Sequence, residues 1–553
     1  MKATQPLDIE ALSTSVSATQ WRDAVIYQIY PRSFLDSNGD GIGDIEGLIK
    51  GLPYLSSLGV DTLWITPFFA SPMHDGGYDV SDYRAVDPMF GKLGDAERFV
   101  RDCHDHGLRV VLDLVANHCS DEHPWFQLAL ASGEDSPERG RFYFFDGRGE
   151  GGALPPTDWM SAFGGPAWTR TVNPDGAPGQ WYLHLFDSSQ PDLNWKNPEV
   201  QNEFDEILRF WFDRGVDGFR LDAIPAIGKD EDFRDLGFES HERFQPELWG
   251  PTPFWDAHGV HDVLKRWRRV GQEYSPEKFF VGEVVVGSTE SLARYIREDE
   301  LQSVFSIELA KLPWDASEFQ STIVNIINSL PPGDSWLTWT LASHDETRTV
   351  TRYAPQVEVD GVIIRDLEVG RQRSRAAYLL VLSLPGAACL YQGEEMGIAQ
   401  VEHIPDELMQ DPIYKRTGDR TLSRDGCRVP LPWTTTGPSM GFSSVDHTWL
   451  PIPPEWSALS IESQLGDEGS FVGFISSVLR LRPLVTSRTS PEVSWDMSTP
   501  GVVILERGES FRCVVNFSGD PWLIGDNDQV IISSEPLGSN RMVASNSAVW
   551  LFR

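Results

Sequence analysis

Three carboxylic acids and two histidines follow apolar runs at separate places in the chain. The polar groups are Asn117-His118 after RVVLDLVA (109–116), Arg220-Leu-Asp222 in VDGFRLDA (216–223), Glu283 in FFVGEVV (279–285), and His344-Asp345 after WLTWTLAS (336–343). In a parallel barrel the carboxyl ends of the strands meet at one rim, so we expect these side chains to converge. Two facing carboxyl groups can cleave a glycosidic bond.

The two acids would need opposite protonation. Arg220 and Asp222 lie two residues apart on a strand and share a face, so we expect the guanidinium to keep Asp222 ionised, as a nucleophile requires. Glu283 follows the apolar FFVG, where desolvation would raise its pKa and keep it protonated, as a general acid requires. A single acid in such a place is more often a solvated loop residue or an ion-pair partner. The whole set at corresponding strand ends favours catalysis, with retention of configuration if the carboxyl groups lie about 5–5.5 Å apart.

Eight apolar runs alternate with longer amphipathic segments, which is typical of parallel strands joined by helices. The runs are 24–30, 62–68, 109–116, 216–223, 279–285, 302–308, 336–343 and 387–393. Eight such units predict an α/β fold, a (β/α)8 TIM barrel. The spacing of the apolar residues between 204 and 212 predicts a helix that Gly215 ends.

Two segments depart from the barrel pattern. Residues 117–195 are rich in Gly, Pro, Trp and Asp without a long helical pattern, which predicts a subdomain inserted after the third strand. From about residue 484, short alternating strands separated by turn residues predict a C-terminal antiparallel β-sandwich. The expected domains are therefore a barrel at 1–116 and 196–483, an inserted subdomain at 117–195, and the sandwich at 484–553.

The composition excludes several classes of partner. The 553 residues include 46 Lys and Arg against 82 Asp and Glu, a formal charge of −36, and 11% are aromatic. Such a surface repels phosphate backbones and anionic lipid, so we expect no nucleic acid and no membrane partner. Aromatic faces suit a small neutral oligosaccharide or glucoside. We expect a monomer or a homodimer.

Other features of the chain favour a cytoplasmic protein without an organic cofactor. The five cysteines are an odd number without paired spacing, the first 20 residues resemble no signal peptide, and the most apolar stretch, 376–391, is short and broken by Pro385-Gly386. No phosphate-binding glycine pattern precedes a helix. His104-Asp105-His106 has a spacing that separates the two rings on a helix, so we expect no zinc site there.

Several strings resemble glycoside hydrolase family 13, the α-amylase family. They are, in chain order, DGGYDVSDY (75–83), DLVANH (113–118), QPDLNW (190–195), GFRLDAI (218–224), GEV (282–284) and SHDE (343–346). QPDLNW, YQGEEMG and DGCRVPLPW (425–433) are similar to the α-glucosidase and oligo-1,6-glucosidase branch. The resemblance covers residue 21 to the C-terminus.

The resemblance implies a role for each matching residue. Asp222 would be the nucleophile, Glu283 the acid and then the base, and Asp345 a fixed carboxylate that stabilises the distorted sugar. The implied substrate contacts are Tyr78 stacking on the ring, Asp79 and Arg428 gripping hydroxyls at the non-reducing end, His118 and His344 donating hydrogen bonds, and Arg220 orienting Asp222. Such a grip closes the cleft beyond one glucose, which separates an exo-acting glucosidase from an endo-acting amylase.

The resemblance thus implies a retaining, exo-acting α-glucosidase that releases glucose from the non-reducing end of short α-glucosides by double displacement, with transglucosylation left open. Ala223, after the nucleophile, favours α-1,4 bonds such as that of maltose, and Ser343 stands where the family commonly has Asn. The alternatives are a trehalose synthase-like glucosyl transferase or isomerase, and an oligo-1,6-glucosidase. A non-catalytic relative, like the amylase-like subunit of amino-acid transporters, would lack the complete triad and carry a membrane anchor.

The loop DSNGDGIGD (36–44) has the oxygen-rich spacing of a calcium site. The expected ligands are Asp36, Asn38, Asp40, the carbonyl of Ile42, and Asp44. Gly47 stands where an EF-hand would place Glu, so the loop would be a stand-alone structural Ca²⁺ site. Solvated turns are the alternative, and the resembling branch carries a similar loop after its first strand.

Overall fold

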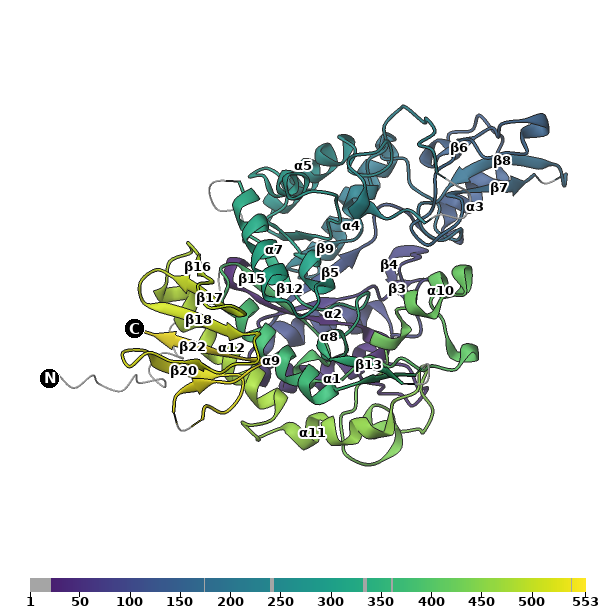
Figure 1. Ribbon diagram of the computed structural model, residues 1–553. Helices are drawn as coiled ribbons and strands as arrows, with labels where there is room; N and C mark the ends of the chain where they lie inside the picture. The colour runs from purple at the N-terminus through teal and green to yellow at the C-terminus, as the bar shows by residue number, and fades with distance from the viewer. Residues whose placement is uncertain (1–20, 174, 239–242, 332–335, 360–361, 539) are drawn as a thin grey trace.

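Eight parallel strands form the centre of the molecule. The computed structural model describes residues 21–553 except 174, 239–242, 332–335, 360–361 and 539 (Figure 1). The central strands are β1 (Val25–Ile29), β2 (Thr62–Ile65), β5 (Arg109–Leu114), β9 (Gly218–Leu221), β10 (Phe279–Gly282), β11 (Ser303–Val304), β12 (Thr338–Thr340) and β15 (Ala387–Tyr391). Their order is β11-β10-β9-β5-β2-β1-β15-β12, and a parallel bridge between Phe305 and Thr338 joins the two ends. The predicted TIM barrel is confirmed, with one strand in each expected run.

The barrel interior is filled by alternate residues of neighbouring strands. Ile26, Val111 and Val281 belong to one buried cluster with Trp64 and Phe305. The other face of the strands packs against the surrounding helices in a larger core. Strands buried on both faces explain why the runs are continuously apolar instead of alternating.

Helices follow the strands and cover the barrel. They are α1 (Ile45–Leu58), α2 (Leu93–Asp105), α4 (Pro198–Phe212), α5 (Gly259–Gln272), α6 (Thr289–Ala293), α7 (Ala316–Ser329), α8 (Thr349–Tyr353) and α9 (Leu367–Ser383), with α10 (Pro412–Thr417), α11 (Ile461–Gln464) and α12 (Phe471–Arg488) later in the chain. The predicted helix between 204 and 212 is confirmed as part of α4. Asn197 caps its first turn and Pro198 takes its first position, while Gly215 adopts a left-handed φ of 95° just after it.

A small sheet lies between β5 and α4 in the chain. It consists of β6 (Phe144–Phe145), β7 (Trp168–Val172) and β8 (Pro178–Leu183) in the order β6-β8-β7, beside α3 (Pro124–Ala131). An aromatic cluster that includes Trp159 and Trp168 joins it to Phe254 and Trp255, which follow β9. In Figure 1 this segment lies at the opposite end of the molecule from the C-terminal strands.

The C-terminal strands form two antiparallel sheets. The larger has the order β16 (Ser494–Asp496), β17 (Val502–Arg507), β18 (Phe511–Asn516), β22 (Ser547–Phe552), β20 (Gln529–Ser533), and the smaller pairs β19 (Trp522–Leu523) with β21 (Met542–Val543). One face of the larger sheet packs on α9, where the indole of Trp550 donates to the carbonyl of Leu379 at 2.9 Å. The other face packs with Ile524 and Val543. The boundary expected at residue 484 falls inside α12, so the strands begin after Arg488.

Two short hairpins were not predicted from the sequence. They are β3 (Phe69–Ala70) with β4 (Asp82–Val86), and β13 (Gln356–Val359) with β14 (Val362–Arg365). Among the described residues, no helix is both long and apolar enough to cross a bilayer.

Candidate active site

A cleft of about 450 Å³ opens at the carboxyl ends of the barrel strands. Its lining includes Tyr78, His118 and the three expected catalytic acids, Asp222, Glu283 and Asp345. Arg220 and His344 line a smaller adjoining cavity of about 40 Å³. The structure therefore brings together most of the residues singled out in the sequence.

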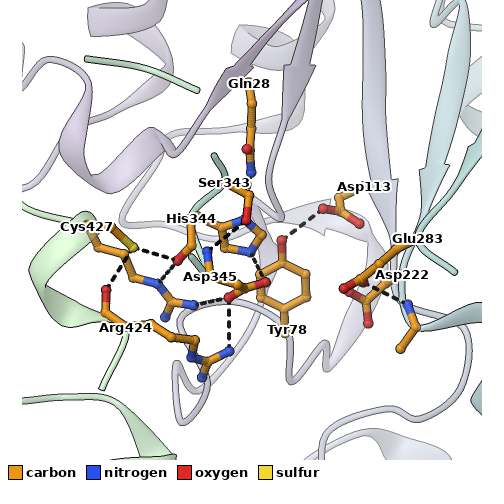
Figure 2. A network of polar contacts seen from close by, with 12 residues as sticks. Gln28, Tyr78, Asp113, Asp222, Glu283, Ser343, His344, Asp345, Arg424 and Cys427 are labelled. Carbon is orange, nitrogen blue, oxygen red and sulfur yellow. Dashed lines mark hydrogen bonds and ion pairs between the residues drawn. The ribbon is translucent and has the colours of Figure 1, made fainter. Parts of the chain in front are cut away.

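One guanidinium holds two of the acids side by side. Arg220, in β9, donates from Nη1 to Oδ1 of Asp222 at 2.7 Å and from Nη2 to Oε2 of Glu283 at 2.6 Å. It also donates from Nη1 to Asp113 at 2.8 Å. Figure 2 shows Asp222 beside Glu283, with Asp345 across the ring of Tyr78. Three carboxyl groups thus share one cation.

Burial acts more strongly on the nucleophile candidate than was expected. It raises the pKa of Asp222 well above its usual range, and that of Asp113 to about 6, although Arg220 opposes both shifts. The side chain of Glu283 is 21% exposed and that of Asp222 is 11% exposed. We expected Glu283 to be the more buried of the two acids, but Asp222 is. We also expected Arg220 to act on Asp222 alone, but its charge is divided among three acids. At neutral pH such a cluster can retain a proton.

Asp345 is the acid with the strongest positive surroundings. Burial alone would raise its pKa, but the neighbouring His344 ring and, as full charges, the guanidinium groups of Arg424 and Arg428 hold that pKa well below the usual range. Arg428 donates from Nη2 at 2.7 Å, and Arg424 from Nη1 at 3.2 Å, to the same carboxylate oxygen. Asp345 is therefore a permanent negative charge beside the two other acids.

Both expected histidines are neutral. Burial lowers the pKa of His118 to about 4 and that of His344 well below its usual value. Nδ1 of His344 contacts the amide nitrogen of Gln28 at 2.6 Å, and Nε2 lies 3.3 Å from Asp345. The ring of His344 stacks on Tyr78 with centroids 5.2 Å apart, while the Tyr78 hydroxyl donates to Asp113 at 2.9 Å. Tyr78 is thereby held as a fixed aromatic surface.

The expected pair at the blind end of the cleft is replaced by a neighbouring pair. Asp79 is fully buried and accepts hydrogen bonds from the backbone N–H groups of His74 and Asp75, so it holds its own loop and does not line the cleft. Arg428 donates from Nε to the carbonyl of His344. Asp75 and Arg424 line the cleft instead, joined by a 2.7 Å ion pair.

Sequence reasoning missed Asp113, Asp75 and Arg424 as site residues. Asp113 and Asp75 open the strings DLVANH and DGGYDVSDY, so the motifs were found but the acids within them were passed over. Arg424 lies one residue before DGCRVPLPW and meets Asp75 across 349 residues of chain. Residues so far apart in the sequence show no local pattern from which their contact could be predicted.

A buried lysine was also missed. Lys229 forms an ion pair with Oδ2 of Asp192 at 2.7 Å and donates to the side-chain oxygen of Asn117 at 2.6 Å. The amide nitrogen of Asn117 in turn donates to Asp192 at 3.1 Å. Lys229 thereby joins the loop after β9, the residue before His118, and the segment between β8 and α4.

The loop at 36–44 has an oxygen-only donor set, which suits a hard cation. Its side chains are Asp36 and Asp44, which are buried, and Asn38 and Asp40, which are exposed. Asp36 accepts backbone N–H groups and the hydroxyl of Ser443, which lower its pKa against the opposing effect of burial. Within the described ranges, no three Asp, Glu, His or Cys side chains converge as metal ligands. The residues fit calcium by type, and the site stays a prediction.

Comparison with known proteins gives a consistent set of matches. Residues 28–487 match the model of the α-amylase catalytic domain. A probable α-glucosidase of Rhizobium meliloti is 36% identical over 519 residues, 90% of each chain. Among solved structures, the α-glucosyl transfer enzyme XgtA is 34% identical with a TM-score of 0.83, over 96% of this chain and 99% of that one. A trehalose-6-phosphate hydrolase of Bacillus licheniformis is 29% identical with a TM-score of 0.81, over 96% and 99%.

Proposed function

The chain belongs to the α-amylase family and is a glycoside hydrolase, and from that premise we propose that it is a retaining, exo-acting α-glucosidase. Its substrates would be short α-glucosides, α-1,4-linked as in maltose, from which it releases glucose at the non-reducing end. The curated relatives named α-glucosidase, from bacteria, insects and yeasts, support this assignment.

The observation that carries the proposal is the pair of carboxyl groups on one guanidinium. Arg220 holds Asp222 and Glu283 next to each other at the floor of the cleft. A shared proton in this cluster is what the first chemical step needs, since one acid must be charged and its neighbour must donate.

The reaction would proceed in two displacements. Glu283 gives its proton to the glycosidic oxygen while Asp222 attacks C1, which breaks the glycosidic bond and forms a covalent β-glucosyl ester. Glu283, now ionised, takes a proton from water, whose oxygen attacks C1 and releases α-glucose and free Asp222. Asp345, kept ionised by Arg424 and Arg428, stabilises the positive charge that develops on the sugar in both steps.

The exo mode of action rests on the Asp75–Arg424 ion pair. Arg424 lies across the ring of Tyr78 from Glu283 (Figure 2), and its guanidinium joins Asp75 to Asp345. A terminal glucose offers hydroxyl groups that such a pair can bind, whereas a continuing chain would have to displace it. Tyr78 would supply the stacking surface, and His118 and His344 would contact the same sugar.

Transfer to a sugar instead of water is a second candidate, because the solved structures of similar fold include glucosyl transfer and trehalulose synthase enzymes. Proton NMR of maltose digests separates the possibilities. Maltose contributes an anomeric mixture from its reducing end, so we expect an excess of α-glucose from the non-reducing end that mutarotates later, with α-glucosyl oligosaccharides as minor products at high maltose concentration. Release of the non-reducing glucose as the β anomer would overturn the two-step mechanism. Accumulation of trehalose without glucose would favour a trehalose synthase-like isomerase, and faster cleavage of isomaltose than of maltose an oligo-1,6-glucosidase.

We also propose a cytoplasmic location, a structural Ca²⁺ at residues 36–44, and a monomer or homodimer. All five cysteines are buried and unpaired, which supports a reducing compartment. Fractionation of the source cell tests the cytoplasmic location. Light scattering, which measures the mass in solution, tests whether the protein is a monomer or a homodimer.

A further inference from the structure

Glu346 lies in the cleft but has no part in the mechanism above. It directly follows Asp345 and lines both the main cleft and the smaller adjoining cavity. Within the part of the chain that the structure describes, its carboxylate forms no hydrogen bond and no ion pair. A partly buried, unpartnered carboxylate in a substrate cleft is available to a ligand.

The charges that face Glu346 place it on the side of the leaving group. It interacts with Glu283, which must point at the glycosidic oxygen, and with Asp345. Glu283 and Glu346 line the same two cavities, which puts Glu346 within reach of the unit that leaves, the aglycone.

The two nearby cations do not neutralise Glu346. Arg352, in α8, donates to the carbonyls of Thr347 and Leu341 at 2.6 Å each. Lys311, at the end of the segment Ile307–Lys311, lies 3.5 Å from Glu247, which also lines the cleft. Arg243 also lines the cleft, but no cation among the described residues lies within ion-pair distance of the Glu346 carboxylate, which is therefore left to face the ligand.

We propose that Glu346 is a specificity-determining residue that makes the aglycone site accept uncharged or cationic units and reject anionic ones, such as phosphorylated or carboxylated sugars. This inference rests on the proposed α-glucosidase function. A carboxylate accepts hydrogen bonds from hydroxyl or ammonium groups, whereas a like charge placed beside it is repelled. The chain would thereby differ in substrate from its relative named trehalose-6-phosphate hydrolase.

The preference should depend on pH. Burial raises the pKa of Glu346 to about 7, Asp345 and Glu283 add to the rise, and Lys311 and Arg352 oppose it. Below this value the carboxyl group is neutral and discriminates weakly. Above it the group is charged, so rejection of anionic aglycones strengthens as the pH rises through 7.

Three maltose derivatives test the proposal. Maltitol, maltobionate and 1-amino-1-deoxymaltitol share one α-1,4 bond and an open-chain aglycone. Their terminal groups are neutral, anionic and cationic, respectively. We expect kcat/KM at pH 8 to be about tenfold or more lower for maltobionate than for maltitol, and highest for the amine. Glu346→Gln should bring the maltitol-to-maltobionate ratio to within about threefold. Glu509→Gln, an exposed position in the turn between β17 and β18, removes the same charge and should leave the ratio unchanged.

The outcomes distinguish a failure of the proposed function from a failure of the proposed role of Glu346. If the unaltered enzyme cleaves no α-glucoside, the proposed function fails. If it cleaves maltose but the ratio is the same in Glu346→Gln as in the unaltered enzyme, the role of Glu346 is refuted. The pH series on the unaltered enzyme needs no variant: a ratio that stays constant from pH 5.5 to 8.5 would also refute it. Glu346→Asp, which keeps the charge, should keep the preference.

Discussion

At the scale of single residues, the site depends on how one cation is shared. Arg220 contacts Asp113, Asp222 and Glu283, so no single acid receives its full stabilising effect. Replacing any one of the three acids should change the proton affinity of the other two. The pH profile of the enzyme should therefore reflect the cluster and not an isolated aspartate.

We expect the acid limb of kcat/KM for maltose to have an apparent pKa near 6, well above the value of about 4 for a free aspartate. The sign follows from burial, which raises the pKa of Asp113 to about 6 and that of Asp222 well above its usual range. Activity should fall as the cluster gains a second proton. Initial rates from pH 4 to 8 measure the limb, and a midpoint near 4 would show that Asp222 titrates as a solvent-exposed acid.

The nucleophile has a direct chemical test. Asp222→Gly should reduce turnover of 4-nitrophenyl α-glucoside by roughly 10³-fold or more, because no side chain remains to attack C1. Azide should restore release of nitrophenol and yield β-glucosyl azide, since the small anion enters where the carboxylate stood. Asp105→Gly, at an exposed position at the end of α2, serves as the control. Full activity of Asp222→Gly without azide, or an α-linked azide product, would contradict the assignment.

At the scale of elements, a buried lysine ties the β5, β8 and β9 connections together. Lys229 and Asp192 are both fully buried, and Asn117 bridges them one residue before His118. Because one ion pair serves three connections, its loss should affect both the fold and the position of His118.

Lys229→Met should lower the free energy of unfolding by about 3–5 kcal/mol, because it leaves Asp192 buried without a cation. Urea unfolding followed by tryptophan fluorescence measures the change. The matched control is Lys196→Met, whose partner Glu231 is exposed and 3.6 Å away, and which should cost at most about 1 kcal/mol. Equal effects of the two changes would mean that the buried pair does not hold the connections.

The elements were predictable where the signal was local. Runs such as AVIYQIY are apolar on both faces, and each of the eight runs contains a barrel strand, although β11 and β12 are shorter than their runs. The acids at strand ends were found for the same reason. Asp75 and Arg424 were not paired in advance, because their contact depends on two loops 349 residues apart. Spacing alone does not show that Asp79 turns into its own loop while Asp75 faces the cleft.

At the scale of the whole molecule, the acidic residues behind the formal charge of −36 fall into groups with different roles. Most acids lie outside the cleft, and of those that line it Glu346 is the one proposed to set the preference for the leaving unit. The loop at 36–44 is expected to affect stability instead, because it packs against the segment around Ser443 and does not line the cleft.

Calcium at this loop should appear as added stability without a change in mechanism. At a concentration 100 times the dissociation constant, a bound ion adds about 2.7 kcal/mol to the free energy of unfolding. We therefore expect excess EDTA to lower the thermal midpoint, Ca²⁺ to restore it, and Asp40→Ala to abolish the response. Identical midpoints with EDTA and with Ca²⁺ would show that solvated turns, and not a metal, form the loop.

The ring of strands is completed at a narrow junction. β11 has two residues, and the described bridge between Phe305 and Thr338 links it to β12. Local opening should start at such a junction, so its backbone amides should exchange with deuterium sooner than those of β1, β2 and β15. Ile307 and Lys311 follow β11 and line the cleft, and His344 and Asp345 follow β12 on the other side of the same junction. Opening of the junction would therefore loosen the wall of the cleft and the carboxylate that stabilises the charged sugar at the same time.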